Sequence, residues 1–266
     1  MENKLMKMIV TVGMAGLFMA GCGTNSAKED SYDQLVQEGE IIMGLDDTFA
    51  PMGFRDTNGE IVGFDVDLAK EVGERLGVTF NFQTVDWAMK ETELNAGNID
   101  VIWNGYTITE EREEKVAFSD PYLDNSQIII VLEESPIQKK ADLAGKTVAA
   151  QQTSSAVDAI TADDSNIIKD FKNGEVVQYP SNNDVFNDLA SGRSDAIVVD
   201  ETLARYYMKQ NADIAYRVLE EDFGKEEYAV GMRKADVKLE KAIDDSLAEM
   251  KTDGTYEKIY SKWFAE

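Results

Sequence analysis

Short apolar runs alternate with amphipathic helical segments along most of the 266-residue chain, and this alternation limits the possible folds more than any other feature. Seven runs predict strands, at residues 41–45, 78–82, 101–103, 128–132, 147–150, 176–179 and 196–199. Between two of them, Phe64, Leu68, Val72 and Leu76 recur at every fourth position and predict a helix that ends at Gly77. Strand–helix alternation predicts an α/β fold with mostly parallel sheets that are covered by helices on both faces.

One pattern occurs twice in the chain. Residues 94–102 (LNAGNIDVI) and 189–197 (LASGRSDAI) share the order L-x-[AS]-G-x-x-D-x-I, which is typical of a glycine-capped helix, a turn and a buried strand. The spacing is too long for a solenoid, so the pattern predicts two lobes of similar build, although such a unit also recurs by chance. Ligands of open α/β sheets bind beyond the carboxyl ends of strands, so two such lobes would enclose a ligand cleft.

The N-terminal segment predicts export and lipid anchoring. Lys4 and Lys7 precede an apolar run at residues 8–20, which is too short to span a bilayer of roughly 30 Å. Small residues directly before the lone Cys22 resemble a bacterial lipobox, with Met19 where leucine is usual. We therefore expect residues 1–21 to be a lipoprotein signal peptide, Cys22 to carry the lipid, and residues 22–38 to be the anchor and a flexible tether. The alternative is a cleaved signal followed by an incidental cysteine.

Composition excludes several functional classes. The chain has 51 acidic and 26 basic residues, no histidine and one cysteine, with a formal net charge of −25. Such an acidic protein repels phosphate backbones, so we expect no nucleic-acid partner. Catalytic sites that depend on histidine are excluded, as are an internal disulfide and a multi-thiolate metal site, and we expect neither a metal nor a cofactor.

The segment at residues 104–112 (NGYTITEER) has the residue types of a carboxylate receptor. Thr109 is a good N-cap for a short helix with acidic residues in its first turn. Arg112 would then sit one turn into this helix, close to the hydroxyl of Thr107 and the flexible backbone at Gly105. A guanidinium presents a planar fork that binds a carboxylate with two hydrogen bonds. A lone arginine among glutamates is more often a solvated helix charge. Here the position just after the predicted strand at residues 101–103 favours the interpretation as a carboxylate receptor.

Five segments in order resemble the bacterial extracellular solute-binding proteins of amino-acid ABC transporters. They are residues 46–51 (DDTFAP), 63–69 (GFDVDLA), 107–112 (TITEER), 118–122 (FSDPY) and 253–264. The resemblance extends from about residue 39 to the end of the chain. It implies a two-lobed periplasmic-binding-protein-like fold with two hinge strands, near residues 125–130 and 226–230, and C-terminal helices packed on the first lobe. The expected lobes are residues 39–125 with 226–266, and residues 126–225.

The same resemblance implies roles at the two charged ends of an amino-acid ligand. Arg112 matches the arginine that clamps the α-carboxylate, and Thr107 with the backbone of Gly105 matches groups that bind the carboxylate and the ammonium. Asp200 matches the second-lobe carboxylate that accepts hydrogen bonds from the ammonium. Ser154 and Ser155 match a turn whose backbone N–H groups meet the carboxylate.

Other matching positions concern the ligand side chain. Phe49 and Trp87 match an aromatic pair that encloses it, and Asp46 matches a position that contacts its distal polar group. The chain departs from the family where Thr153 replaces a common glycine, where Asn104 replaces a small residue, and at Gln151, which some relatives use to read the side chain. An acidic distal pocket repels glutamate and aspartate, so we expect a polar or cationic side chain.

These expectations describe a non-catalytic, monomeric receptor outside the cytoplasm, anchored to the bacterial cell membrane through Cys22. It would bind an L-amino acid by closing its cleft and deliver it to an ABC transporter permease. The main alternative is an enzyme on the same scaffold, such as a dehydratase of a small carboxylic acid, with Asp46 or Asp200 as general acid. A third interpretation is the ectodomain of a sensor, but no downstream transmembrane helix supports it.

Overall fold

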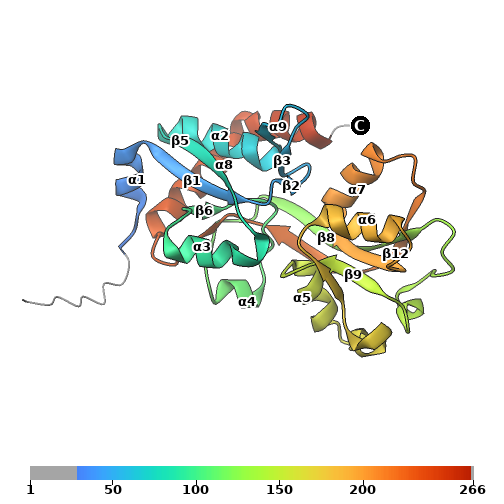
Figure 1. Ribbon diagram of the computed structural model, residues 1–266. Helices are drawn as coiled ribbons and strands as arrows, with labels where there is room; N and C mark the ends of the chain where they lie inside the picture. The colour runs from blue at the N-terminus through green and yellow to red at the C-terminus, as the bar shows by residue number, and fades with distance from the viewer. Residues whose placement is uncertain (1–28, 265–266) are drawn as a thin grey trace, which may run out of the picture.

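The computed structural model describes residues 29–264, so the predicted signal peptide and Cys22 lie outside the described residues. The described chain forms two lobes, each built on a five-stranded sheet (Figure 1). The sheet of lobe 1 has the order β5-β1-β6-β13-β7 and contains β1 (Glu40–Leu45), β5 (Thr79–Thr84), β6 (Val101–Ile102), β7 (Ala117–Phe118) and β13 (Gly231–Met232). The sheet of lobe 2 has the order β10-β9-β11-β8-β12 and contains β8 (Leu123–Leu132), β9 (Val148–Gln151), β10 (Val177–Tyr179), β11 (Ala196–Asp200) and β12 (Tyr216–Tyr228).

Helices cover these sheets, and a small third sheet joins lobe 1. The α-helices are α1 (Tyr32–Glu38), α2 (Phe64–Leu76), α3 (Lys90–Ala96), α4 (Glu110–Glu113), α5 (Ser155–Ala162), α6 (Asn182–Ala190), α7 (Glu201–Gln210), α8 (Val237–Asp253) and α9 (Thr255–Phe264). Four 3-10 helices are η1 (Trp87–Met89), η2 (Lys140–Leu143), η3 (Ile167–Asp170) and η4 (Lys172–Gly174). The third sheet consists of β2 (Thr48–Phe49), β3 (Gly53–Arg55) and β4 (Ile61–Val62). No helix within residues 29–264 is long and apolar enough to cross a bilayer.

Most strands of each sheet run in one direction, as predicted. In lobe 1, β1 pairs in parallel with β5 and β6, and in lobe 2, β9 pairs in parallel with β10 and β11. The remaining pairs are antiparallel, because β13 in lobe 1 and β8 in lobe 2 run against the other four strands of their sheets. The prediction of mostly parallel sheets therefore holds for four strands of each sheet and is wrong for β13 and β8.

Two strands carry the chain between the lobes. β8 and β12 pair antiparallel from Leu123 opposite Tyr228 to Leu132 opposite Tyr216, and they run from one lobe into the other (Figure 1). β8 contains all of residues 125–130, which were expected to cross, and β12 contains residues 226–228 of the expected 226–230. The expected lobe boundaries after residues 125 and 225 fall within these strands. The predicted two-lobed α/β fold with two connecting strands is thus present.

The repeated sequence pattern forms the same structure in both lobes. Gly97 after α3 and Gly192 after α6 both adopt left-handed backbone, with φ of 83° and 73°. Asp100 then accepts a hydrogen bond from the N–H of Ile42 over 2.9 Å, and Asp195 accepts one from Thr147 over 2.8 Å. Each aspartate thereby ties the turn to the neighbouring parallel strand, so the repeat reflects two lobes of similar build rather than chance.

The C-terminal helices pack on lobe 1, as predicted. α8 and α9 lie against α2, where the ring of Phe264 contacts that of Phe64 at 5.0 Å between centroids. Trp263 Nε1 donates to Asp67 of α2 over 2.7 Å. Helices α8 and α9, which follow lobe 2 in the sequence, therefore cover α2 of lobe 1.

The N-terminal tether is shorter than expected. The prediction that residues 22–38 are flexible is wrong for 32–38, which form α1 and bury Leu35. The N–H of Ser31 donates to Asp236 over 2.8 Å, and the N–H of Lys238 donates to Asp30 over 2.5 Å. The helix is therefore held by residues about 200 positions away in the sequence, which local composition does not reveal.

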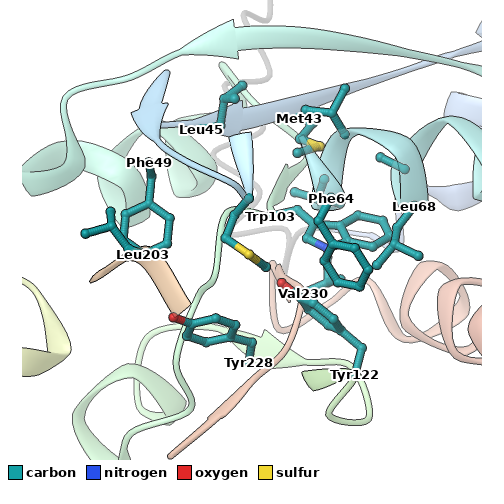
Figure 2. Close-up of a cluster of buried hydrophobic side chains, with 14 of the residues drawn as sticks. Met43, Leu45, Phe49, Phe64, Leu68, Trp103, Tyr122, Leu203, Tyr228 and Val230 are labelled. Atoms are coloured by element: carbon teal, nitrogen blue, oxygen red, sulfur yellow. The ribbon is translucent and has the colours of Figure 1, made fainter. Parts of the chain in front are cut away.

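The apolar core continues from one lobe to the other. Figure 2 shows Phe49 of lobe 1 beside Leu203 of α7, and below them Tyr228 of β12. Met43, Phe64 and Trp103 extend the same cluster into lobe 1, and Phe49, Leu203 and Tyr228 are all buried. The lobes thus meet through buried apolar contacts next to the polar cavity described below.

Candidate functional site

A narrow cavity of about 10 Å³ lies between the two lobes. From lobe 1 it is lined by Phe49, Trp87, Gly105 and Arg112, and from lobe 2 by Gln151, Ser154, Ser155, Ala156, Asn182, Val199 and Asp200. Eight of the predicted site residues are among them. Of the other three, Asp46 and Thr107 form hydrogen bonds with the lining residues Gln151 and Ser155, and Asn104 forms one with Asp46.

Arg112 is held rigidly at one end of the cavity. Thr109 caps α4 by accepting a hydrogen bond from the N–H of Arg112 over 3.2 Å, as the sequence predicts. The guanidinium stacks on the ring of Tyr106, 4.7 Å from its centre, and Nη1 donates to the carbonyl of Thr107 over 2.9 Å. Nη2 reaches the carbonyl of Thr153 on lobe 2 over 3.3 Å. The stacked, buried cation is well placed to meet a carboxylate.

Asp200 ends β11 on the opposite lobe. Its Oδ2 accepts a hydrogen bond from the hydroxyl of Tyr228 over 2.7 Å, and its Oδ1 accepts one from Gln127 Nε2. Burial raises the pKa of Asp200 to about 7, and the negative charge of Glu226 acts in the same direction. The carboxylate is therefore a buried acceptor that a cation would stabilise.

Two hydroxyl groups join the lobes between these charges. Thr107 Oγ1 of lobe 1 lies 3.1 Å from Ser155 Oγ of lobe 2, and both are buried. Thr107 also donates to Glu226 over 2.9 Å, and Ser155 Oγ lies 3.1 Å from Gln127 Nε2. Ser154 is the N-cap residue of α5, although its hydroxyl donates back to the carbonyl of Gln151 instead of capping the helix.

Gly105 is required by its surroundings. Its φ is +58°, and a Cβ there would come within 2.8 Å of Phe49 and 3.1 Å of Tyr228. Its N–H donates over 2.7 Å to Asp65, a fully buried carboxyl that also accepts from the hydroxyl of Tyr122 over 2.9 Å. Burial raises the pKa of Asp65 to about 8. Because the N–H is occupied, the carbonyl is the backbone group that Gly105 offers to the cavity.

The far end of the cavity is polar and acidic. Gln151 Nε2 donates to Asp46 Oδ2 over 2.7 Å, and Asn182 Nδ2 donates to Gln151 Oε1 over 2.9 Å. Burial raises the pKa of Asp46. Asn104 lies behind this group, where its Oδ1 accepts from the N–H of Asp46 over 3.0 Å. Phe49 and Trp87 supply the aromatic surface of the cavity.

Sequence reasoning did not identify Lys90, a cation beside the site. Its side chain is 2% exposed, and Nζ lies 3.1 Å from the carbonyl of Trp87 and 3.4 Å from that of Thr153 on lobe 2. Burial lowers the pKa of Lys90 to about 8, and the charge of Arg112 adds to this effect. In the sequence, the one sign that Lys90 is buried is its position one helical turn before Leu94, which places both residues on the same face of the helix.

Asn182 and Glu226 were also not identified. Asn182 directly follows Ser181, the N-cap of α6, and reads as an ordinary helix start. Glu226 lies in an acidic stretch of β12 and reads as a solvated charge. Within residues 29–264, no cluster of three or more histidine, cysteine, aspartate or glutamate side chains could hold a metal ion.

Comparison with known proteins places the chain in a family. The family model of bacterial extracellular solute-binding proteins, family 3, matches residues 41–266. The L-cystine-binding protein TcyJ of Escherichia coli K12 is 32% identical over 254 residues, which are 94% of this chain and 92% of that protein. The lysine/arginine/ornithine-binding periplasmic protein of the same strain is 35% identical over 246 residues, 90% of this chain and 92% of that protein.

Solved structures agree with this placement. An ABC uptake transporter substrate-binding protein of Streptococcus pneumoniae with bound histidine has a TM-score of 0.86 and 38% identity, over 89% of this chain and 97% of that one. The structure of Tv2483 bound to L-arginine has a TM-score of 0.81 and 31% identity, over 90% and 96% of the two chains. Together with its two lobes and the cavity between them, these similarities show that the chain belongs to family 3 of the bacterial extracellular solute-binding proteins.

Proposed function

We propose that this protein is a receptor that binds a free L-amino acid between its lobes and delivers it to the permease of an ABC transporter. The observation that carries the proposal is that Arg112 of lobe 1 and Asp200 of lobe 2 line the same narrow cavity between the lobes. A cation and an anion on opposite walls complement the carboxylate and ammonium of a zwitterion. The names of the similar proteins support an amino-acid ligand.

Each end of the ligand has its own partners in this proposal. Arg112 binds the α-carboxylate with two hydrogen bonds, and the backbone at Ser154 and Ser155, where α5 begins, adds the favourable end of a helix dipole. Asp200, Thr107 and the carbonyl of Gly105 accept hydrogen bonds from the ammonium.

The distal groups favour a polar or cationic side chain. Phe49 and Trp87 provide faces on which a planar or aliphatic chain packs, and Asp46, Gln151 and Asn182 meet its polar end. The buried carboxylate of Asp46 repels an acidic side chain, so glutamate and aspartate are disfavoured.

Ligand binding is coupled to closure because its partners lie on different lobes. Only the closed arrangement allows Arg112 and Asp200 to contact one molecule, so the ligand shifts the equilibrium towards that state. β8 and β12 are the hinge strands, and the permease would recognise the closed form.

The receptor is proposed to act outside the cytoplasm, anchored to the cell membrane by a lipid on Cys22 after removal of residues 1–21. The sequence of the N-terminal segment supports this. Labelling of cells with a radioactive fatty acid should mark the wild type and not Cys22→Ser. We further propose that the body is a monomer, which light scattering of the protein without residues 1–22 tests.

An enzymatic role is not supported. The family consists of solute-binding proteins, and the curated relatives are named for binding an amino acid. One similar solved structure, with 34% identity and a TM-score of 0.78, is an ancestral amino-acid-binding protein described as a precursor of cyclohexadienyl dehydratase, and it is itself a binding protein. Asp46 and Asp200 have binding roles in the proposal above and need no catalytic one.

Titration calorimetry with each of the twenty L-amino acids and L-cystine tests the proposal. We expect at least one polar or cationic amino acid to bind with a Kd near the micromolar range, about −8 kcal/mol. L-glutamate and L-aspartate should bind much more weakly. Absence of binding heat with every compound, for a protein that unfolds cooperatively, would contradict the receptor function.

A further inference from the structure

Glu226 lies on β12 opposite Asn125 of β8, at the point where the two hinge strands pair between the lobes. Its Oε1 accepts hydrogen bonds from Asn125 Nδ2 over 2.6 Å, from Gln127 Nε2 over 2.8 Å and from Thr107 Oγ1 over 2.9 Å. Ser155 Oγ lies 3.4 Å from the same oxygen. One carboxylate oxygen therefore gathers polar groups from a hinge strand and from both lobes.

These contacts fix the direction of the hydrogen bonds. A carboxylate only accepts, so Thr107 must donate its single hydroxyl proton to Glu226. With that proton used, the oxygen of Thr107 can only accept across the 3.1 Å that separates it from the Ser155 hydroxyl. Thr107 retains only acceptor capacity for a ligand, and this suits an ammonium group and not a carboxylate.

Glu226 also acts on Asp200. Gln127 Nε2 donates to both carboxylates, so the amide group bridges them. The charged and polar groups that face Asp200 are Glu226 and Tyr228 of β12, Gln127 of β8 and Arg112 of α4. The charge of Glu226 raises the pKa of Asp200, whereas the other three lower it.

We propose that Glu226 is a positioning residue that makes the ammonium end of the site specific for a charged amine. It turns Thr107 into an acceptor and holds Gln127 against Asp200, while its own contacts join the two lobes at the hinge. This inference rests on the proposed amino-acid receptor function, and it assigns a role to a side chain that does not line the cavity.

The test compares wild type, Glu226→Gln and Glu227→Gln by calorimetry with L-arginine and L-glutamine between pH 5.5 and 8. Glu227 is the matched control, because it is the next residue of β12, carries the same charge and is exposed. We expect Glu226→Gln to weaken binding about tenfold at pH 8, since its hydrogen bonds to Thr107, Asn125 and Gln127 lose their charged acceptor. Glu227→Gln should change the Kd less than twofold.

The pH dependence separates this role from a structural one. Asp200 must lose its proton to accept from the ammonium, so wild-type affinity should fall as the pH drops below about 7. Without the charge of Glu226 the pKa of Asp200 is lower, and the midpoint of this fall should move to lower pH in Glu226→Gln alone. An unchanged Kd, or a loss of affinity with an unmoved midpoint, would overturn the proposal.

A double-mutant cycle with Thr107→Val measures the link between the two residues directly, and thermal unfolding checks that each variant is folded. Thr107→Val removes the hydroxyl with little change in volume, and in the presence of Glu226→Gln it should add little further loss. If the two losses add in full, the proposed link between these residues does not exist. If the wild type binds neither amino acid, the proposed ligand class is wrong. If Glu226→Gln and Thr107→Val bind with the wild-type Kd, the role of Glu226 is wrong and the receptor function stands.

Discussion

Gln151 of lobe 2 and Asp46 of lobe 1 form a direct hydrogen bond of 2.7 Å across the interlobe cavity, and both side chains are buried. Asn182 donates to the other end of the Gln151 amide, so the amide orientation is fixed and its N–H group faces the carboxylate. A carboxylate held in this way is a strong acceptor at the distal end of the site.

Replacement of Asp46 should therefore change ligand preference. Asp46→Asn removes the charge and keeps the shape, so the Kd for L-arginine should rise about tenfold or more, while that for L-glutamine changes much less. Calorimetry with both amino acids measures the ratio. Asp47→Asn is the control, because the Asp47 side chain pairs with Arg55 and Thr84, whereas Asp46 bonds to Gln151 of the cavity lining. An equal effect of Asp46→Asn on both ligands would refute a distal role for this charge.

Lys90 should contribute to affinity through its contact with lobe 2. Lys90→Met keeps the aliphatic length but removes the ammonium that lies 3.4 Å from the carbonyl of Thr153. We expect a Kd about three to ten times higher, which corresponds to one hydrogen bond. Lys70→Met, at an exposed position of α2, should leave the Kd unchanged. Equal affinities of Lys90→Met and wild type would show that this contact is irrelevant to binding.

Asp65 should make the protein less stable as the pH rises. Its pKa is raised to about 8, so between about pH 4 and 8 the folded protein holds a proton that the unfolded chain has released. The free energy of unfolding then falls with increasing pH, by up to about 1.4 kcal/mol per unit for this group.

Asp65→Asn removes that titration and retains an oxygen for Gly105 and Tyr122. Urea unfolding at pH 5 and pH 8.5 should therefore show the variant gaining stability relative to wild type at the higher pH. The same difference between variant and wild type at both pH values would contradict a protonated Asp65.

Gly105→Ala should harm both stability and binding. Left-handed backbone costs about 1–2 kcal/mol for a residue with a Cβ, and the new methyl group would also press against Phe49. Gly97→Ala is a matched control, because its φ of +83° has the same cost but nothing lies within 4 Å of the added Cβ. We expect both variants to lower the melting temperature and only Gly105→Ala to weaken binding. A similar loss of affinity in Gly97→Ala would argue against the packing explanation.

The parts of the fold that local patterns determine were predictable. The repeated glycine and aspartate of residues 94–102 and 189–197 do form equivalent turns, because a left-handed cap and a side-chain-to-backbone bond need only nearby residues and one adjacent strand. The same holds for Thr109, which caps the helix that carries Arg112.

Features that depend on distant contacts were not predictable. α1 is held in place because residues 30 and 31, which precede it, form hydrogen bonds with Lys238 and Asp236. The reversed direction of β8 and β13 follows from the path of the chain between the lobes. Lys90 and Glu226 look like surface charges in the sequence, and only tertiary packing brings them to the site.

The central claim is that Arg112 and Asp200 grip the two ends of one amino acid, and the affinity of Arg112→Ala tests it most directly. Calorimetry should compare this variant with wild type, using the amino acid that binds wild type most tightly in the screen of twenty. Thermal unfolding should show that both proteins are folded. Loss of a buried cation that pairs with a carboxylate costs several kcal/mol, so we predict binding at least about 100-fold weaker. A folded Arg112→Ala that binds the same amino acid with the wild-type Kd would contradict the account.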